Sequence, residues 1–317
     1  EHQHTGVAWL QHLWKLSPQQ CRGTILADDM GLGKTTAAVI ASLESNARKI
    51  LIVCPASLKI NWQREIENYT DRRIMLVEGR KWGSTFDYYI INYDILKNFH
   101  STDKSEDSDD YKLLINAGFE LAIVDEAHYI SNNTAQRTRL LNDVLEQIPK
   151  VWLLTGTPMT SRPINYFNLL KIVESPLTLN WQSYVRRYCA GYQFRVGQRK
   201  VWNTSGASNL DELRERTKSL VLRRMKTDIL DLPEKIVTPV YLEGSIPEAM
   251  AMVNDLRENY GIFCSIVVYP VIPKGLIILR LIPTATHTQE DIDETIKAFS
   301  AIREKLANGS YKQVAVS

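Results

Sequence analysis

The chain has 317 residues, of which 44% are hydrophobic and 23% charged, and its net charge at neutral pH is +2. This balance is typical of a globular protein with room for two domains; it excludes disorder throughout, and so small a charge does not by itself mark a nucleic-acid binder. The four widely spaced cysteines (Cys21, Cys54, Cys189 and Cys264) argue against a zinc site or a disulfide framework, and no segment has the apolar length of a membrane span, so we expect a reducing intracellular compartment and no membrane partner.

The first elements predicted are a helix and a glycine-containing turn. Val7, Leu10 and Leu13 recur at helical spacing, and the stretch from Thr24 to Thr35 is a short apolar run, a turn and the start of a second helix. This order predicts a phosphate-binding loop, in which backbone N–H groups at a helix N-terminus bind an anion. We expect ATP to contact Asp29, Met30, Gly31, Leu32, Gly33, Lys34, Thr35 and Thr36.

Two side chains of this loop have predicted roles. Lys34 would reach the β- and γ-phosphates, and the Thr35 hydroxyl would ligate Mg²⁺. Asp28 stands where the pattern G-x-x-x-x-G-K-[ST] has its first glycine. For this stretch taken alone, a chance Gly-Lys-Thr in an ordinary turn is therefore the alternative.

Short apolar runs then alternate with helical patterns. Ser57 is expected to cap one of the helices. Strands are predicted at residues 49–54, 74–77, 88–92, 119–124 and 151–154, and helices at residues 36–45 and from 57 to about 69. This alternation predicts an α/β fold with a parallel sheet covered by helices on both faces. The acidic segment at residues 101–110 is interpreted as a solvated loop rather than a functional site.

Polar residues follow two of the later strands. Asp125 and Glu126 stand at the end of the strand at 119–124, where open α/β sheets bind ligands. Asp125 would hold Mg²⁺ through water, and Glu126 would orient the attacking water. The alternative for this pair alone is two charges at a helix N-terminus. Thr155-Gly156-Thr157 follows the strand at 151–154 and should end near the nucleotide.

Residues 181–226 are rich in arginine, lysine and aromatic residues. The aromatic residues Tyr184, Tyr188, Tyr192, Phe194 and Trp202 are interleaved with cationic ones: Arg186, Arg187, Arg195, Arg199, Lys200, Arg214, Arg216, Lys218, Arg223, Arg224 and Lys226. Such a mixture suits a surface that follows a phosphate backbone. A solvated helical face with its aromatic residues packed inward explains the composition equally well.

These motifs together carry a family resemblance over residues 1–243. Leu26–Thr35, Pro55–Leu58, Asn61-Trp62, Asp125-Glu126-Ala127-His128, Leu154–Pro158 and Leu222-Arg223-Arg224 resemble the first RecA-like lobe of SWI/SNF-type ATPases of helicase superfamily two. Residues 187–213 resemble the annealing-helicase branch. The resemblance implies adenine recognition by Gln3 and translocation on double-stranded DNA. It also implies contacts of Ser57, Lys59, Thr155, Gly156 and Thr157 with DNA or with the coupling to ATP, in the nucleus of a eukaryote or the cytoplasm of a bacterium.

A complete member of that family continues into a second RecA-like lobe, which supplies arginine fingers. After Lys235 this chain departs from that pattern, and a second lobe in cis or in trans is implied as a partner. From Ile246 a helix, two strands within 262–272 and 276–282, and a helix from His287 to Leu306 are predicted, with Thr288 near the start of the last helix. We expect a small two-layer α-β-β-α unit.

The tail resembles a different family. Residues 269–275, 280–288 and 291–293 are similar to the C-terminal piece of pyridoxal-phosphate-dependent α-oxoamine synthases, closest to serine palmitoyltransferase. There the arginine matching Arg280 holds a carboxylate; an ordinary arginine at a strand end is the alternative favoured here. The Schiff-base lysine belongs to a large domain that the resemblance does not cover, so pyridoxal phosphate is not expected. Gly244-Ser245 marks the predicted seam between domains 1–243 and 244–317, as in an engineered fusion.

The leading hypothesis is thus the ATP-binding lobe of a double-stranded-DNA-dependent ATPase, with a tail of another origin. A second hypothesis is a non-catalytic module that binds ATP and DNA, because one lobe lacks half of the active site. A third is an acyltransferase fragment joined to a nucleotide-binding domain. DNA-stimulated phosphate release separates the first two, and the absorbance of an internal aldimine tests the third.

Overall fold

The computed structural model describes residues 2–99, 113–159, 162–229, 246–267, 278–281 and 288–311. It divides into two compact units, Glu1–Leu232 and Pro233–Ser317, and each is described by itself. The predicted seam at Gly244-Ser245 and the acidic segment at 101–110 lie outside the described residues. Within the described part, no helix is both long enough and apolar enough to cross a membrane.

The first unit is built on a seven-stranded sheet in the order β3-β4-β2-β5-β6-β1-β9, and each neighbouring pair is parallel. Its strands are β1 (Gly23–Leu26), β2 (Ile50–Cys54), β3 (Ile74–Leu76), β4 (Tyr88–Asn92), β5 (Leu121–Val124), β6 (Lys150–Leu154) and β9 (Val221–Leu222). The predicted α/β class with a parallel sheet is confirmed. Five of the strands are fully buried along their whole length, as expected when helices cover both faces.

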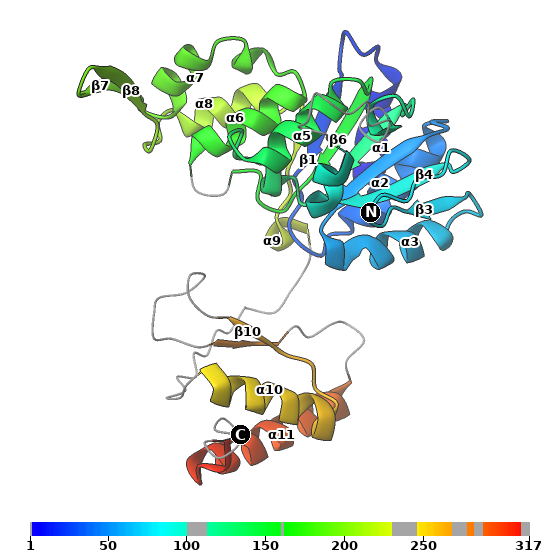
Figure 1. Ribbon diagram of the computed structural model, residues 1–317, viewed down its shortest axis with the longest axis vertical. Coiled ribbons are helices and arrows are strands. Elements are labelled where there is room, and N and C mark those ends of the chain that lie inside the picture. Colours follow the sequence, from blue (N-terminus) through cyan, green and yellow to red (C-terminus); the bar gives the residue numbers. More distant parts are fainter. Residues whose placement is uncertain are drawn as a thin grey trace. The chain divides into compact units, whose positions relative to one another are not determined.

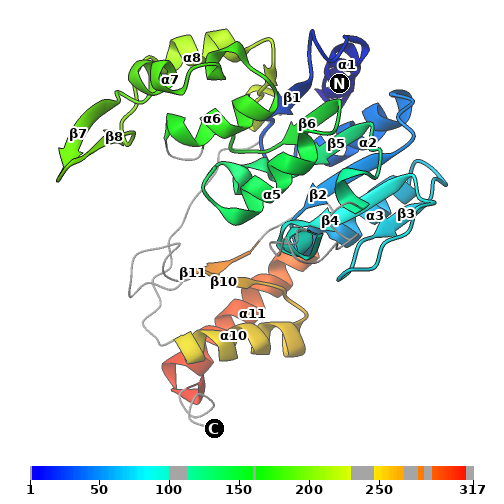
Figure 2. The same ribbon diagram turned by 45° about the horizontal axis from the view of Figure 1, so that its top comes forward.

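Helices cover both faces of this sheet (Figures 1 and 2). Alternate residues of a strand point to opposite faces, so Ile50 and Ile52 of β2 pack in one apolar cluster while Leu51 and Val53 pack in the other. The first cluster includes side chains of α1 (His2–Lys15), α2 (Lys34–Glu44) and α3 (Lys59–Glu67). The second includes those of η2 (Tyr93–Phe99), α5 (Gln136–Leu145) and α6 (Pro163–Ile172).

The strand register brings three loops to the same edge of the sheet. Leu26 at the end of β1 pairs with Leu154 at the end of β6, and Leu153 pairs with Val124 at the end of β5. Since all three strands are parallel, the residues that follow them start side by side. β6 lies between β1 and β5, an order that the sequence alone does not specify.

One local expectation was wrong. Ser57 does not cap a helix with its side chain, because it lies inside a short 3-10 helix, η1 (Ala56–Leu58), that runs directly into α3.

In the basic and aromatic region, the alternative of a purely helical face does not hold. Between α7 (Trp181–Tyr188) and α8 (Leu210–Thr217) the chain forms an antiparallel hairpin of β7 (Tyr192–Val196) and β8 (Arg199–Asn203). The remaining elements of this unit are η3 (Ala127–Ile130), η4 (Pro176–Thr178) and α9 (Lys226–Ile229).

The second unit has the expected element order. α10 (Ile246–Tyr260) is followed by the antiparallel pair β10 (Ser265–Val267) and β11 (Ile278–Arg280), and then by α11 (Gln289–Ala307). Thr288 and Asp291 form the capping box that begins α11, as the sequence predicts. A small separate core, which includes Leu256 of α10 and Ile302 of α11, joins the two helices.

Candidate functional site

The loop between β1 and α2 has the backbone of an anion-binding nest. Gly31 and Gly33 adopt positive φ angles of 81° and 76°, which residues with a Cβ rarely adopt. Gly33 is the N-cap of α2, and no side chain caps the helix there. The first N–H groups of α2 therefore lack an intrahelical acceptor and point toward the loop, where an anion would satisfy them.

Lys34 turns its ammonium group back into this loop. Its Nζ donates to the carbonyl oxygens of Asp28 and Asp29, at 2.9 and 3.2 Å. Burial lowers the pKa of Lys34, while the nearby carboxylates of Glu126 and Asp125 oppose that shift. The predicted phosphate-binding lysine and the predicted acidic pair are therefore close enough to interact electrostatically.

Glycines mark two close approaches to the loop. A Cβ added at Gly33 would lie 2.2 Å from Nε2 of Gln3, so the amide of Gln3, from α1, covers this glycine directly. A Cβ added at Gly156, after β6, would lie 3.0 Å from Cγ of Met30. The residues after β6 thus contact the loop, as expected, and Gln3 lies beside the predicted nucleotide site.

Asp125 is held in place from several directions. Nε1 of Trp62, on α3, donates to its Oδ2 at 2.8 Å, and the backbone N–H of Glu126 donates to its Oδ1 at 2.9 Å. The hydroxyl of Tyr93 donates to its backbone carbonyl at 2.5 Å. Burial raises the pKa of Asp125, and the bond from Trp62 partly offsets that rise. These contacts fix a buried carboxylate at the carboxyl end of β5.

Glu126 has an unusual backbone and a basic neighbour. Its φ of 49° and ψ of 48° place it in the left-handed region, which is uncommon for a residue with a side chain. Its Oε2 lies 3.1 Å from Nδ1 of His128, a close approach without hydrogen-bond geometry, and Nδ1 has no hydrogen-bond partner among the described residues. The contact with His128 lowers the pKa of Glu126, so its carboxylate is charged near neutral pH.

A buried ion pair explains why Asp28 replaces a glycine. Nε of Arg224, which follows β9, donates to Oδ1 of Asp28 at 2.9 Å, and a second nitrogen of the same guanidinium contacts Oδ2. A third nitrogen donates to the carbonyl of His2 at 2.6 Å. The side chain of Asp28 is 2% exposed and that of Arg224 16%. One arginine therefore joins the loop, the start of α1 and the segment after β9.

Several other predicted residues have defined places. The hydroxyl of Thr36 donates to Glu65 on α3. Thr35 and the backbone N–H groups, with Lys34, are therefore the groups in the first turn of α2 that remain to bind a nucleotide. Ser57 and Thr157 are exposed, whereas Thr155 is buried and its Oγ1 accepts from the N–H of Thr157. In the second unit, Arg280 is an exposed residue of β11, paired with Ser265.

The structure corrects the expectation for Lys59. This residue is buried, and its Nζ donates to the carbonyl of Val77 at 2.6 Å. Burial lowers the pKa of Lys59. Its ammonium group supports the packing of α3 beside β3 and is not presented to DNA as an exposed cation.

The residues present fit a nucleotide with a magnesium ion. An uncapped helix start, two glycines with positive φ and one partly buried lysine suit a polyphosphate. No group of three or more His, Cys, Asp or Glu side chains that could hold a metal occurs in the described residues. Mg²⁺ keeps several waters and is held by few protein groups together with phosphates, and the Thr35 hydroxyl and the Asp125 carboxylate are oxygen donors of the kind that it takes.

Sequence reasoning placed Trp62 and Arg224 in family motifs and Arg224 and Lys226 in the basic region, but gave none of the three a role at the nucleotide site, to which the structure brings them. Nζ of Lys226 would lie 3.2 Å from a Cβ added at Gly31. Asp28 offered a signal for Arg224. A carboxylate in the loop after a buried strand is costly unless a donor or a cation satisfies it. A separate hollow of about 550 Å³ lies between η4, α7 and Arg216 and shares no residue with this site.

Comparisons with known proteins identify a family and a fold. Residues 2–249 match the family described as the SNF2-related domain. The chain is 32% identical over 225 residues to the human DNA annealing helicase and endonuclease ZRANB3, covering 67% of this chain and 20% of that protein. It is 32% identical over 251 residues to a Caenorhabditis elegans homolog of SWI/SNF-related matrix-associated actin-dependent regulator of chromatin subfamily A-like protein 1, covering 74% of this chain and 33% of that protein.

A second kind of relative matches a short part of the chain. Over 78 residues the chain is 76% identical to a cysteate-C-fatty acyltransferase from Capnocytophaga ochracea, which covers 25% of this chain and 19% of that enzyme. Among solved structures, the Sulfolobus solfataricus SWI2/SNF2 ATPase core in complex with double-stranded DNA is similar in fold, with a TM-score of 0.53 at 20% identity and coverage of 96% of this chain and 57% of that one. The chain spans about a fifth to a third of the length of these curated relatives.

Proposed function

Since this chain belongs to the SNF2-related family over residues 2–249, we propose that it is the ATP-binding first lobe of a double-stranded-DNA-dependent ATPase and translocase. The family is associated with nucleotide hydrolysis, and the RecA-like sheet carries the site at the edge expected for a ligand. The names of two relatives, a DNA annealing helicase and an SWI2/SNF2 core bound to double-stranded DNA, support DNA as the substrate.

One observation carries the proposal: the ends of β1, β6 and β5 lie side by side in register. The loop with Lys34, the contact at Gly156 and the pair Asp125-Glu126 therefore lie at the same edge of the sheet. Chance glycines in a turn would not be accompanied by a partly buried lysine whose pKa is lowered by burial and raised by two carboxylates that follow a strand two positions away in the sheet. The arrangement therefore supports nucleotide hydrolysis over the alternative of an ordinary turn.

Each residue then has a role in phosphoryl transfer. Bound Mg·ATP supplies the phosphoryl group and neutralises part of its charge. The backbone N–H groups from Gly31 to Thr35 bind the phosphates, and Lys34 adds a positive charge. Thr35 and Asp125 hold the ion, Asp125 through water. Glu126 keeps its carboxylate charged and orients the attacking water.

Gln3 and the loop after β6 complete the site. The amide of Gln3 lies against Gly33, where it can bond to the base of the nucleotide. Gly156 contacts Met30 of the phosphate loop, while Thr157 is exposed. Because Thr157 directly follows Gly156, a DNA strand bound at Thr157 would influence the phosphate loop through the contact of Gly156 with Met30. Ser57, also exposed, is the remaining candidate for DNA contact in this part of the chain.

The lobe needs a partner for full activity. Phosphoryl transfer depends largely on positioning and charge stabilisation, and an arginine finger is worth about 10³–10⁵ in rate. In the proposed assembly, a second RecA-like lobe supplies this arginine in cis or in trans. We therefore expect the isolated chain to hydrolyse ATP slowly, with little stimulation by duplex DNA, in an intracellular setting that is nuclear in a eukaryote.

The test is a steady-state ATPase titration with duplex DNA at low salt, with and without a separately expressed second lobe. Slow hydrolysis that Glu126→Gln abolishes, and that rises when the second lobe and DNA are added together, is the expected result. Absence of ATP binding by calorimetry would overturn the proposal. Strong DNA-stimulated turnover by this chain alone would overturn the requirement for a partner lobe.

For the tail we propose a different origin. The 76% identity over 78 residues to an acyltransferase supports assigning residues 244–317 to the C-terminal piece of such an enzyme. Arg280 is exposed at the end of β11 in a unit with its own small core. We propose that this unit does not bind pyridoxal phosphate by itself. An internal-aldimine absorbance after incubation with pyridoxal phosphate would contradict that expectation.

A further inference from the structure

The β7–β8 hairpin is a distinct surface of the first unit. Among the described strands, β7 and β8 pair only with each other and not with the seven-stranded sheet. Figures 1 and 2 both show the hairpin projecting beyond α7 and α8, at the end of the unit away from that sheet. The nucleotide site uses none of its residues, so the hairpin requires a separate explanation.

One face of the hairpin carries large apolar side chains in solvent. The side chains of Tyr192, Phe194 and Val196 share a face with that of Val201, which is opposite Phe194. Their exposed fractions are 58%, 41%, 57% and 40% respectively. The ring centroids of Tyr192 and Phe194 are 6.2 Å apart. Scattered exposed apolar side chains are common on protein surfaces, but a contiguous group of them often marks a binding site.

The opposite face packs against α7. The ring of Trp202 meets that of Trp181 edge-on, with centroids 5.7 Å apart. The guanidinium of Arg186 lies over Trp202, 5.3 Å from the ring centroid. Because this face anchors the hairpin to the rest of the unit, the face with Tyr192 and Phe194 points away from it.

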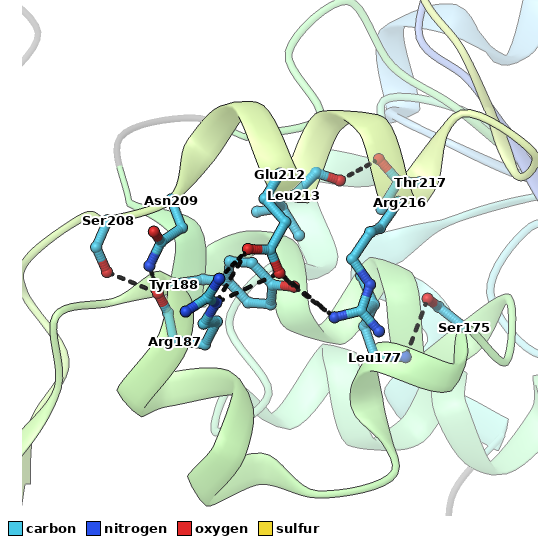
Figure 3. A network of polar contacts seen from close by, with 10 residues as sticks. All are labelled: Ser175, Leu177, Arg187, Tyr188, Ser208, Asn209, Glu212, Leu213, Arg216 and Thr217. Carbon is cyan, nitrogen blue, oxygen red and sulfur yellow. Dashed lines mark hydrogen bonds and ion pairs between the residues drawn. The ribbon is translucent and has the colours of Figure 1, made fainter.

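A polar network fixes the base of the hairpin (Figure 3). The carbonyl of Arg187, in the last turn of α7, accepts hydrogen bonds from Ser208 Oγ at 2.8 Å and Asn209 Nδ2 at 2.7 Å, just before α8. Glu212 of α8 accepts from Arg187 Nε at 3.0 Å and from the Tyr188 hydroxyl at 3.0 Å. The two chain ends of the hairpin are therefore held together, so its apolar face keeps one orientation and loses little entropy on binding.

The charged residues of the hairpin itself have one sign. Between Glu174 and Asp211 the sequence contains no aspartate or glutamate. It contains five cationic residues, of which Arg195, Arg199 and Lys200 belong to the hairpin. All three are exposed; Arg199 shares the face of Tyr192 and Phe194, and Arg195 and Lys200 lie on the opposite face. A cation beside apolar rings suits a partner that combines negative charge with flat apolar groups.

We propose that the β7–β8 hairpin binds single-stranded DNA, with unpaired bases stacked on Tyr192 and Phe194 and a phosphate bound by Arg199 on the same face. This inference deepens the proposed function, because it takes DNA as the polyanion that the chain meets. Aromatic side chains beside a positive surface are the usual platform for unpaired bases, and stacking on them tolerates any base sequence. In a blunt duplex the base faces are covered by their neighbours, so the two rings would gain nothing there.

The experiment measures binding by fluorescence anisotropy with oligothymidine of about 12 nucleotides and with a blunt duplex. The variant is Tyr192→Ala/Phe194→Ala. Each stacked ring contributes about five-fold or more in affinity, so the double variant should bind oligothymidine at least about 10-fold more weakly. Phe194→Trp, which keeps a ring, should bind as tightly as the parent. Tyr69→Ala is the matched control. Tyr69 lies just after α3, outside the hairpin, and is 48% exposed, so its substitution should not change the affinity.

The cation has a separate readout. Arg199→Gln should reduce the dependence of log affinity on log salt by about 0.7, the value for one phosphate contact on a single strand. Unchanged salt dependence would remove Arg199 from the proposed site. Because Arg199 is exposed on a hairpin held at its base, ATP binding by this variant serves as the check that the unit is folded.

The outcomes separate this inference from the proposed function. Loss of oligothymidine binding with unchanged ATP and duplex affinity supports the hairpin site. Equal binding of oligothymidine by the parent and the double alanine variant overturns it and leaves the apolar face to a protein partner. Equal losses for oligothymidine and duplex also overturn it, because the rings would then not select unpaired bases. Failure of the parent to bind ATP or duplex would instead count against the proposed function, whatever the hairpin does.

Discussion

Trp62 donates a hydrogen bond from its indole nitrogen to the buried carboxylate of Asp125, over a distance of 2.8 Å. Trp62 is fully buried on α3, and Asp125 follows β5, so the bond joins a helix on one face of the sheet to the edge that carries the site. A carboxylate buried without such donors would be strongly destabilised in its charged form. The tryptophan thus supports the charge that the proposed magnesium site requires.

The first prediction follows from this bond. Trp62→Phe should keep most of the apolar packing but remove the donor to Asp125, which we expect to cost about 1.5–3 kcal/mol in the free energy of unfolding at neutral pH. Hydrolysis of Mg·ATP should fall as well, because the carboxylate loses the donor that fixes its orientation toward the ion. Urea unfolding and single-turnover hydrolysis measure the two effects. Trp14→Phe, at a partly buried tryptophan of α1, is a control for the ring change.

The cost of Trp62→Phe should depend on pH. Burial already raises the pKa of Asp125 above its ordinary value of 3.8, so the folded state favours the protonated form, and losing the bond from Trp62 raises this pKa further. A group with a raised folded pKa stabilises the fold at low pH and loses that contribution as pH rises through the folded pKa. The difference in unfolding free energy between parent and variant should therefore be largest at neutral pH and shrink toward pH 4. An equal difference at both pH values would contradict the role given to Asp125.

Glu126→Gln should abolish hydrolysis while leaving Mg·ATP binding nearly intact. The amide keeps the shape of the side chain but cannot polarise water, and general-base catalysis is worth about 10²–10⁴-fold. Single-turnover hydrolysis at saturating ATP measures the loss, and calorimetry measures the binding. Equal rates for variant and parent would show that another group activates the water.

His128 should set the acid limit of this activity. Its contact lowers the pKa of Glu126 below the ordinary 4.5, so the carboxylate remains charged until the pH falls through that lower value. In His128→Asn the pKa of Glu126 should return upward, and the acid limb of the pH–rate profile should move to higher pH. An unmoved limb would mean that Glu126 does not titrate in the rate-determining step.

Two lysines at the phosphate loop should differ in their effects. Lys34→Ala should weaken ATP binding by about 10- to 100-fold, because a partly buried cation is removed from the phosphates. Lys226→Ala, which removes a half-buried ammonium beside Gly31, should weaken ATP binding by a smaller factor. Lys15→Ala, at an exposed position in the last turn of α1, should have no effect. Calorimetry with ATP compares the three, and unchanged affinity in Lys34→Ala would refute the phosphate-loop assignment.

The ion pair of Arg224 with Asp28 should contribute mainly to stability. Arg224→Gln leaves a nearly buried carboxylate without its partner, which costs about 3–5 kcal/mol. Asp28→Gly in the same chain restores the usual glycine of the loop and removes that unpaired charge, so the double variant should recover much of the loss. Thermal or urea unfolding of the four chains in this cycle measures the coupling. Additive losses would show that the two side chains do not act as a pair.

The sequence by itself determined the strands and the position of the chemistry along the chain. Runs such as residues 50–54 and 121–124 are apolar on both faces, which only a strand buried between two helical layers requires. Gly31, Gly33 and Lys34 are recognisable because a phosphate loop depends on backbone conformations that few residues adopt. The acidic pair is recognisable because it directly follows a strand. All of these signals are local, so they survive in a single sequence.

Only the tertiary structure decided which distant residues complete the site. Trp62 and Asp125 are 63 positions apart, and Asp28 and Arg224 are 196 apart, so no local pattern connects them. The position of β6 between β1 and β5 also comes only from the tertiary structure, because the same strand sequences are compatible with other orders of strands in a parallel sheet. The composition of residues 181–226 suited a surface that follows a phosphate backbone and a solvated helical face equally well, and it did not predict the hairpin within this region. Cross-strand pairing and the anchoring of Trp202 on α7 select the hairpin, because these contacts exist only once α7 and α8 have packed together.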